Sequence, residues 1–171
     1  LRDNKKTEIA RLNAIYRKLL HGAGATVFEG RASIVDGNTV AVGEKHYRCG
    51  KILIATGGWP SVPEFPGSEH ALTSNEIFDL ESFPERIAIV GGGYIAVEFA
   101  GIFNGLGADV TQVEMAPRIM GREDPDVAEL MRQRFASEGV TVLTDHKAKA
   151  VEVENGEKTL ICEHNGGDVR I

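Results

Sequence analysis

A glycine-rich turn between two apolar strands constrains this chain more than any other feature of its sequence. Gly91, Gly93 and Ala96 have the G-x-G-x-x-G/A spacing and directly follow the apolar strand predicted at 87–90. Glycines there permit a sharp turn and a close approach to a diphosphate, and the small third residue lets the next helix pack on the sheet. The helix predicted at 94–106 then directs its first N–H groups and its positive dipole end toward that anion.

An acidic residue follows this turn at the distance typical of a dinucleotide site. Residues 110–113 alternate as a second strand, and Glu114 lies 21 residues beyond Gly93, at the end of that strand. A carboxylate at this place can accept hydrogen bonds from a ribose diol. Glycine triads also occur for packing reasons alone, but here strand, turn, helix, second strand and acid occur together. The sequence therefore predicts a dinucleotide-binding site.

Length and composition are those of an ordinary soluble globular protein, with 171 residues, 42% hydrophobic and 26% charged. This length allows one domain and part of another. No apolar run approaches the roughly 20 residues that span a bilayer, and the N-terminus lacks the apolar region of a signal peptide, so we expect a cytoplasmic protein without membrane contact. Lys and Arg outnumber Asp and Glu by 10 to 5 over 1–58, but are outnumbered by 20 to 9 over 59–171. Neither a basic run nor interleaved aromatics accompany the basic half, which argues against a nucleic-acid partner.

The periodicity of the chain predicts an α/β fold. We expect a Rossmann-like three-layer dinucleotide-binding domain over 84–171, preceded by a proline-rich linker and a short helix over 59–83. The Thr73 and Glu76 pair has capping-box spacing and opens that short helix. Other helices are predicted at 3–21 and 124–138, and strands at 26–29, 32–35, 39–42, 46–48, 51–55, 140–143, 147–153, 158–164 and 169–171.

The two cysteines and five histidines do not form a recognisable site. Cys49 and Cys162 are 113 residues apart and match neither a metal pattern nor a C-x-x-C pair. We expect both to be buried structural thiols. No histidine has a partner at ligand spacing, so no metal site is predicted.

Two segments carry a resemblance to a known family. KILIATGG (51–58) and GGGYIAVEFAGIFNGLGA (91–108) resemble the pyridine nucleotide-disulfide oxidoreductases, with the second segment closest to the glutathione reductase branch. VTQVEMAPRIMGRED (110–124) and the C-terminal tail resemble the mercuric reductase and dihydrolipoamide dehydrogenase branches instead. The resemblance implies a homodimeric flavoprotein that passes electrons from NAD(P)H through FAD and a cysteine pair to a disulfide such as glutathione disulfide. Mercuric reductase and dihydrolipoamide dehydrogenase activities are the alternatives within the family.

The same resemblance assigns roles to individual residues. Residues 1–58 would be the C-terminal part of a FAD-binding segment. Tyr94 would cover the flavin and move aside for the nicotinamide, and Glu98 would lie beside the carboxamide. Without the resemblance, Tyr94 could equally be a packing residue and Glu98 a surface carboxylate. The FAD contacts would be Ala32, Ala55, Thr56 and Gly57, and the NAD(P) contacts Gly91, Gly93, Tyr94, Ile95, Ala96, Glu98, Glu114, Met115, Arg118 and Arg122.

The choice between the two nicotinamide cofactors depends on charge. Where the glutathione reductase pattern has arginines for the 2′-phosphate of NADPH, this chain has Met115 and Gly121. At about 4 Å and an effective dielectric near 20, a carboxylate repels a phosphate charge by up to ~4 kcal/mol, so Glu114 favours NADH. Arg118 and Arg122 could offset this repulsion by binding a phosphate, or they could be ordinary arginines of an exposed loop.

The redox C-x-x-x-x-C and the His-Glu pair of this family do not occur in the sequence. We therefore expect this chain to be part of a longer enzyme, able to bind a nucleotide without completing turnover. Two other functions stay open. One is a nucleotide-binding regulatory module, which would not need the flavin-type motif at 55–57. The other is a flavoenzyme without a disulfide substrate, such as an NADH oxidase or a transhydrogenase.

Overall fold

The computed structural model describes residues 2–171 and divides into two compact units, one ending at Trp59 and the other running from Pro60 to Ile171. We refer to them as unit 1 and unit 2 and describe each by itself. Within residues 2–171, none of the helices combines the length and the apolar composition that crossing a membrane requires.

Unit 1 consists of one long helix and a small antiparallel sheet. Helix α1 spans Arg2–Gly22, close to the predicted 3–21, and the chain leaves it through Gly24, whose φ is +77°. Strands β1 (Ala32–Asp36), β2 (Thr39–Val42) and β3 (Lys45–Arg48) pair in sequence order. In the turn after β1, the Asp36 carboxylate accepts a hydrogen bond of 2.8 Å from the Asn38 N–H. These three strands agree with the sequence prediction.

Two other strand predictions in unit 1 were wrong. Residues 26–29 and 51–55 lie in irregular segments, not in strands. A strand persists only if its N–H and C=O groups find a neighbouring strand, and within the described residues neither segment has one. The compact apolar sequence of 51–55 is typical of a strand buried on both faces, yet Leu53 is 88% exposed.

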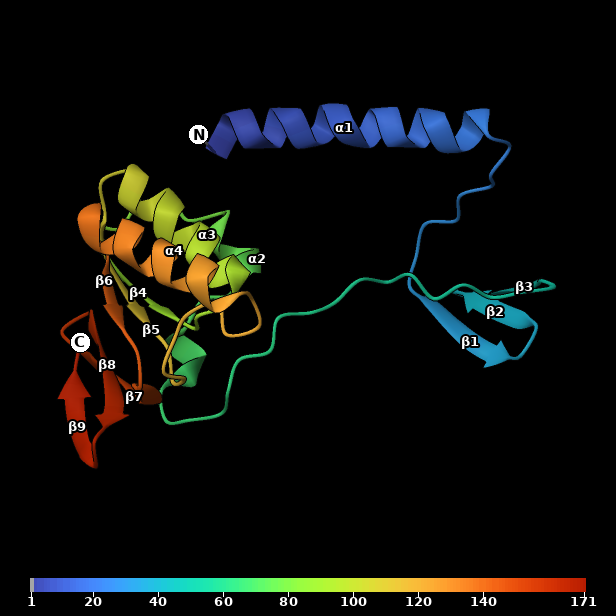
Figure 1. Ribbon diagram of the computed structural model, residues 1–171. Coiled ribbons are helices and arrows are strands. Elements are labelled where there is room, and N and C mark those ends of the chain that lie inside the picture. The colour runs from blue at the N-terminus through green and yellow to red at the C-terminus, as the bar shows by residue number, and fades with distance from the viewer. Residues whose placement is uncertain (1) are drawn as a thin grey trace. The chain divides into compact units, whose positions relative to one another are not determined.

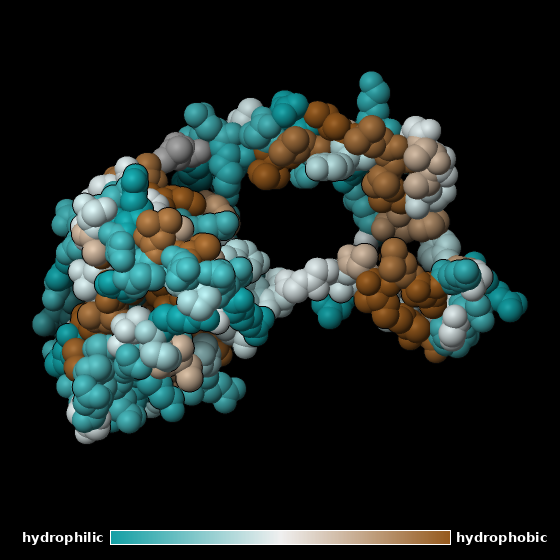
Figure 2. All heavy atoms as spheres, in the orientation of Figure 1, coloured by the Kyte–Doolittle hydropathy of each residue, from teal (hydrophilic) through white to brown (hydrophobic). Residues whose placement is uncertain are grey.

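The apolar surface of unit 1 is incompletely covered. Helix α1 buries none of its residues, although Leu19 and other apolar side chains repeat along it. Ile34 on β1 and Phe28 before it are about half exposed, at 54% and 50%. In Figure 2, brown hydrophobic surface is visible along α1 and at the small sheet of unit 1. Exposed apolar area of this extent is typical of a surface that contacts another part of a protein or a partner.

Unit 2 is a three-layer α/β domain (Figure 1). Strands β4 (Arg86–Val90), β5 (Asp109–Val113) and β6 (Thr141–Leu143) form a parallel sheet in that order, and helices α3 (Tyr94–Gly105) and α4 (Pro125–Ser137) cover one face. Strands β7 (Lys147–Glu154), β8 (Glu157–His164) and β9 (Gly167–Arg170) form an antiparallel sheet. The turn at Asn155 and Gly156 joins β7 to β8, as its Asn-Gly sequence predicts.

The side chains of β5 point alternately to the two faces of the parallel sheet, and this alternation explains how the layers are held together. Val110 is fully buried in a cluster with Ala100 of α3 and Phe135 of α4. Val113 points to the other face and packs with Leu160 and Cys162 of β8. Because successive side chains of a strand point to opposite faces, one central strand anchors both neighbouring layers. The predicted α/β fold class is therefore confirmed.

Of the segment predicted to be a linker with a short helix, 59–83, all residues from Pro60 onward belong to unit 2. They contain the 3-10 turn η1 (Ser68–His70) and helix α2 (Ser74–Ile77). The predicted capping box is formed: the Glu76 carboxylate accepts from the Thr73 N–H at 2.8 Å, and the Thr73 hydroxyl accepts from the Asn75 N–H at 3.2 Å. The Val151 N–H of β7 donates to the Pro66 carbonyl at 2.9 Å, which attaches the segment to the hairpin.

The two cysteines differ in environment. Cys162 is fully buried, as predicted, and its burial raises the pKa of the thiol. The prediction for Cys49 was wrong, because this residue is half-buried and its thiol donates to the Asn38 carbonyl at 3.5 Å. Cys49 directly follows β3 of the small sheet of unit 1.

Candidate functional site

The glycine-rich turn begins where β4 ends, and three hydrogen bonds fix its first two residues. The Gly91 N–H donates to the Val113 carbonyl at 2.7 Å, which continues the ladder between β4 and β5. The Gly91 carbonyl accepts from the Gln112 side-chain amide at 2.9 Å, and the Gly92 carbonyl accepts from the Met120 N–H at 2.6 Å. Gly91 has a φ of +123°, which side chains rarely tolerate, so the turn requires glycine here.

Helix α3 begins with N–H groups that are available to a ligand. Gly93 is its N-cap, and the first bond inside the helix runs from the Val97 N–H to the Gly93 carbonyl at 3.1 Å. The N–H groups of residues 94–96 therefore have no acceptor within the helix. A Cβ on Gly93 would have no neighbouring atom within 4 Å, so the space beside the N-cap residue is open. This geometry suits a diphosphate.

Glu114 lies beside the same turn with a fixed side chain. Its Oε1 accepts a hydrogen bond of 2.7 Å from the Ala116 N–H. Its backbone is held on both sides, because the Glu114 N–H donates to Leu143 at 2.8 Å and the His146 N–H donates to the Glu114 carbonyl at 3.0 Å. The side chain lies against Gly92, as a Cβ built on that glycine would be 2.8 Å from both Cγ and Oε2 of Glu114. The predicted ribose acceptor is thus next to the predicted diphosphate cradle.

The two loop arginines are placed differently from each other. Arg118 is half-buried and donates to the carbonyls of Gly121 at 2.8 Å and Glu123 at 3.2 Å, so its guanidinium closes the loop that follows β5. Arg122 lies exposed on that loop, and Met115 is 68% exposed directly after Glu114. Arg118 would have to give up loop bonds to hold a phosphate.

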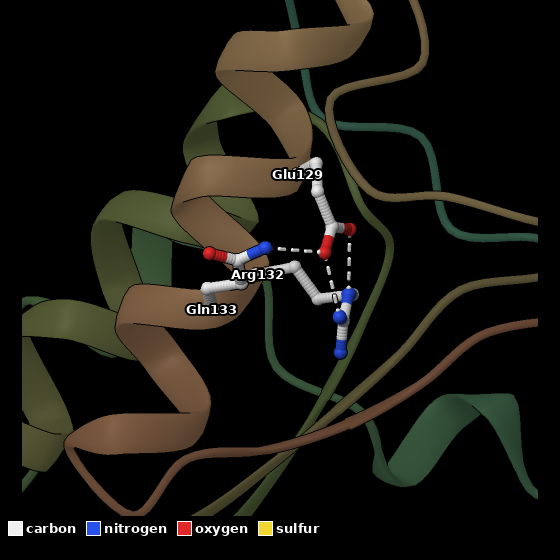
Figure 3. A network of polar contacts seen from close by, with 3 residues as sticks. All are labelled: Glu129, Arg132 and Gln133. Carbon is white, nitrogen blue, oxygen red and sulfur yellow. Dashed lines mark hydrogen bonds and ion pairs between the residues drawn. The ribbon is translucent and has the colours of Figure 1, made fainter.

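A hollow of about 370 Å³ lies between this loop and the first turns of α4. Its charged lining is satisfied internally (Figure 3): the Glu129 carboxylate accepts from Arg132 at 2.7 and 2.8 Å and from Gln133 at 2.8 Å. These hydrogen bonds lower the pKa of Glu129 to about 2. Residues of the loop, of α4 and of β6 with its following residue line the hollow, namely Pro117, Arg118, Pro125, Ala128, Glu129, Arg132, Val142 and Thr144. Across residues 2–171, no group of three or more His, Cys, Asp and Glu side chains could hold a metal ion.

The remaining predicted site residues lie on both units. Tyr94 opens α3 with 62% of its surface exposed, and Glu98 lies exposed one turn later on the same helix face. In unit 1, Ala32 opens β1 and is exposed. Residues 55–57 are also exposed, in a segment without regular structure. The structure brings together Gly91, Gly93, Ile95, Ala96 and Glu114 around one turn.

Sequence reasoning missed three residues that support the turn. Gln112 is fully buried, and its Oε1 has no hydrogen-bond partner within the described residues. The sequence did contain a signal for Gln112, because this polar residue occupies an inward position of β5 two residues after Val110. Met120 has a φ of +52°, and His146 stacks on His164 with ring centroids 4.0 Å apart. Neither is recognisable from a local pattern.

Comparison with known proteins identifies the family of the chain. The model of the family described as pyridine nucleotide-disulphide oxidoreductase matches residues 2–170. The chain belongs to this family. It is similar to a glutathione reductase of Nostoc sp., with 42% identity over 145 residues, which is 85% of this chain and 32% of that protein. It is 52% identical over 107 residues to the chloroplastic/mitochondrial glutathione reductase of Pisum sativum, covering 63% of this chain and 19% of that protein.

The structure is also similar to a solved member of this oxidoreductase class. The HOCl-induced flavoprotein disulfide reductase RclA of Escherichia coli matches with a TM-score of 0.79 and 26% identity, over 98% of this chain and 39% of that chain. The family and its glutathione reductases use FAD and NAD(P)H. The chain spans about a third of the length of the Nostoc enzyme and about a fifth of the length of the Pisum sativum enzyme.

Proposed function

We propose that this chain supplies the NAD(P)-binding domain and part of the FAD-binding segment of a flavoprotein disulfide reductase. The observation that carries the proposal is the turn at residues 91–93, with unbonded N–H groups of α3 in front of it and the Glu114 carboxylate beside it. These groups fit an adenosine diphosphate: the amides suit the diphosphate, and the carboxylate suits the ribose diol. Residues 84–171 are the nucleotide-binding domain in this proposal.

NADH is the nicotinamide cofactor that the charges favour. The Ala116 N–H holds the Glu114 carboxylate in place, so the carboxylate cannot turn away from a 2′-phosphate without losing a hydrogen bond of 2.7 Å. Repulsion of up to ~4 kcal/mol at about 4 Å then opposes NADPH. Arg118 offers limited compensation, because two carbonyls of its own loop already occupy its guanidinium. Met115 offers none, because its side chain is uncharged.

The catalytic roles in the proposal belong to two residues of α3. When bound, the nicotinamide supplies a hydride and the flavin passes the electrons on to a cysteine pair outside this chain. Tyr94 covers the flavin site until the nicotinamide arrives, and its 62% exposed ring is free to make and leave such a contact. Glu98, on the same helix face, accepts a hydrogen bond from the carboxamide and orients the ring.

The other parts of the proposal rest on the family. Residues 1–58 form the C-terminal part of the FAD-binding segment, with Ala32, Ala55, Thr56 and Gly57 near the cofactor. The substrate is a small disulfide such as glutathione disulfide. The complete enzyme is a cytoplasmic homodimer. The apolar surface of unit 1 supports the first point, because Leu53 and Ile54 of the flavin-type motif are 88% and 68% exposed.

Nucleotide titration tests the proposal. We expect the 171-residue chain to bind NADH more tightly than NADPH, and Glu114→Ala to weaken NADH binding about 10- to 100-fold, since hydrogen bonds to charged groups contribute about 1.5–3 kcal/mol. Glu154→Ala, which removes the same charge from the exposed end of β7, is the matched control and should change neither affinity. An unchanged NADH/NADPH ratio in Glu114→Ala would remove Glu114 from the recognition role.

The flavin part of the proposal has its own test. The full-length protein should be yellow as purified and absorb in the flavin band. A colourless full-length protein that cannot take up FAD would rule out the reductase. It would leave the nucleotide-binding regulatory module as the function.

A further inference from the structure

Gly92, the middle residue of the turn, is a glycine for a different reason from Gly91. Gly91 needs its φ of +123°, whereas Gly92 is not among the residues with positive φ. A positive φ therefore does not explain a glycine at this position. Gly92 is nevertheless buried, so the space next to its Cα must account for it.

That space is taken by Glu114. A Cβ on Gly92 would lie 2.8 Å from Cγ, 2.8 Å from Oε2 and 3.1 Å from Cβ of Glu114, and real Cβ atoms essentially never have neighbours closer than 3.0 Å. One of the two side chains would have to shift. The clash involves two atoms along the glutamate side chain, so a rotation of the terminal carboxylate alone does not relieve it.

An alanine at position 92 would force the Glu114 side chain out of its present position. Its backbone is fixed by hydrogen bonds to Leu143 and from His146, of 2.8 and 3.0 Å. The side chain must therefore move, and its hydrogen bond of 2.7 Å from the Ala116 N–H would break. On the other side, the Gly92 carbonyl accepts from the Met120 N–H at 2.6 Å, which resists a shift of the turn.

We propose that Gly92 is a specificity-determining residue, because its missing side chain lets the Glu114 carboxylate stand beside the turn and select a dinucleotide with a free 2′-hydroxyl. The inference rests on the proposed function, and it assigns the selectivity to a pair of residues 22 positions apart in the sequence. Gly92→Ala should weaken NADH binding about 10- to 100-fold, as loss of a hydrogen bond to a charged group does. NADPH binding should stay the same or improve, because the repelling carboxylate is displaced.

A double-mutant cycle on the 171-residue chain tests this coupling. The dissociation constants of NADH and NADPH are measured for wild type, Gly92→Ala, Glu114→Ala and the double variant. If Gly92 acts through Glu114, adding Gly92→Ala to Glu114→Ala changes the NADH affinity less than about 2-fold, because the two clashing atoms are gone. Gly101→Ala, within α3 and with no atom within 4 Å of the added Cβ, is the matched control and should leave both affinities unchanged.

Each outcome decides a different point. Failure of the wild-type chain to bind NADH would overturn the proposed function itself. If wild type binds but Gly92→Ala retains full NADH affinity, or loses as much affinity in the Glu114→Ala background, the inference is wrong and the proposed function stands. Should Gly92→Ala fail to fold, the double variant decides: recovery of folding supports the clash with Glu114, and a second failure overturns it.

Discussion

Gln112 offers a way to separate the stability of the turn from its binding function. Its side chain is fully buried on β5, and its amide N–H donates a hydrogen bond of 2.9 Å to the Gly91 carbonyl. Its Oε1 has no partner among the described residues. Gln112→Met retains the length and nearly the volume of the side chain but removes both polar atoms. The substitution thus deletes one good hydrogen bond and one unsatisfied oxygen together.

The magnitudes of these two effects predict the outcome. Losing a neutral hydrogen bond costs about 0.5–1.5 kcal/mol, whereas removing a buried polar atom without a partner returns about 1–3 kcal/mol. We therefore expect the free energy of unfolding to stay the same or rise by up to about 2 kcal/mol. NADH binding should nevertheless weaken by roughly 3- to 10-fold, or up to about 1.4 kcal/mol, because the Gly91 carbonyl loses its anchor.

Urea denaturation gives the free energy of unfolding, and nucleotide titration gives the dissociation constant. Thr111→Val, on the same strand but on its opposite face, controls for general effects on β5 and should leave NADH binding unchanged. If Gln112→Met lowers the free energy of unfolding by more than about 2 kcal/mol, then Oε1 has a hydrogen-bond partner in the wild-type molecule, and the reasoning fails. Unchanged NADH affinity would show that the turn does not depend on Gln112.

Three further predictions concern other parts of the chain. Gly67→Ala should destabilise unit 2 by roughly 2–4 kcal/mol in a thermal or urea melt, because φ is +80° and the new Cβ would lie 1.9 Å from the Val151 carbonyl oxygen, whereas Gly37→Ala should have little effect. The pKa of Glu129, lowered to about 2 by Arg132 and Gln133, should return toward 4.5 in Arg132→Ala when followed by NMR; since the folded pKa is depressed, any stability from this pair is present above pH 4.5 and lost as pH falls toward 2. A thiol reagent should modify half-buried Cys49 in the native chain and spare Cys162, whose burial raises the pKa of its thiol; equal rates would contradict the assignment.

The parallel domain could be predicted because its signals are local. The strand at 87–90, the helix from Tyr94 and the strand before Glu114 each carry their own periodicity, and short connections leave few ways to assemble them. The hairpin turn at residues 155–156 and the capping box at Thr73 and Glu76 are likewise encoded in adjacent residues. Each of these predictions required only neighbours in sequence.

The predictions that were wrong or missing concern features that depend on residues distant in sequence. Residues 26–29 and 51–55 have strand composition, but no described strand pairs with them. The exposure of Cys49 depends on which layer covers the small sheet. In the site, the glycine spacing indicates a dinucleotide but not the contact between Gly92 and Glu114, nor the support from Gln112 and Met120. These contacts arise only when β4, β5 and the following loop are assembled.

The central claim is that the turn at 91–93 binds a diphosphate while Glu114 holds the adjoining ribose. Titration of the isotope-labelled chain with NADH, followed through its backbone amide NMR signals, tests it most directly. We expect the amide signals of residues 92–96 and of Ala116, whose N–H donates to the Glu114 carboxylate, to move together and saturate with one dissociation constant. If these signals stay in place at millimolar NADH while the chain remains folded, the turn is not a dinucleotide site and the central claim is wrong.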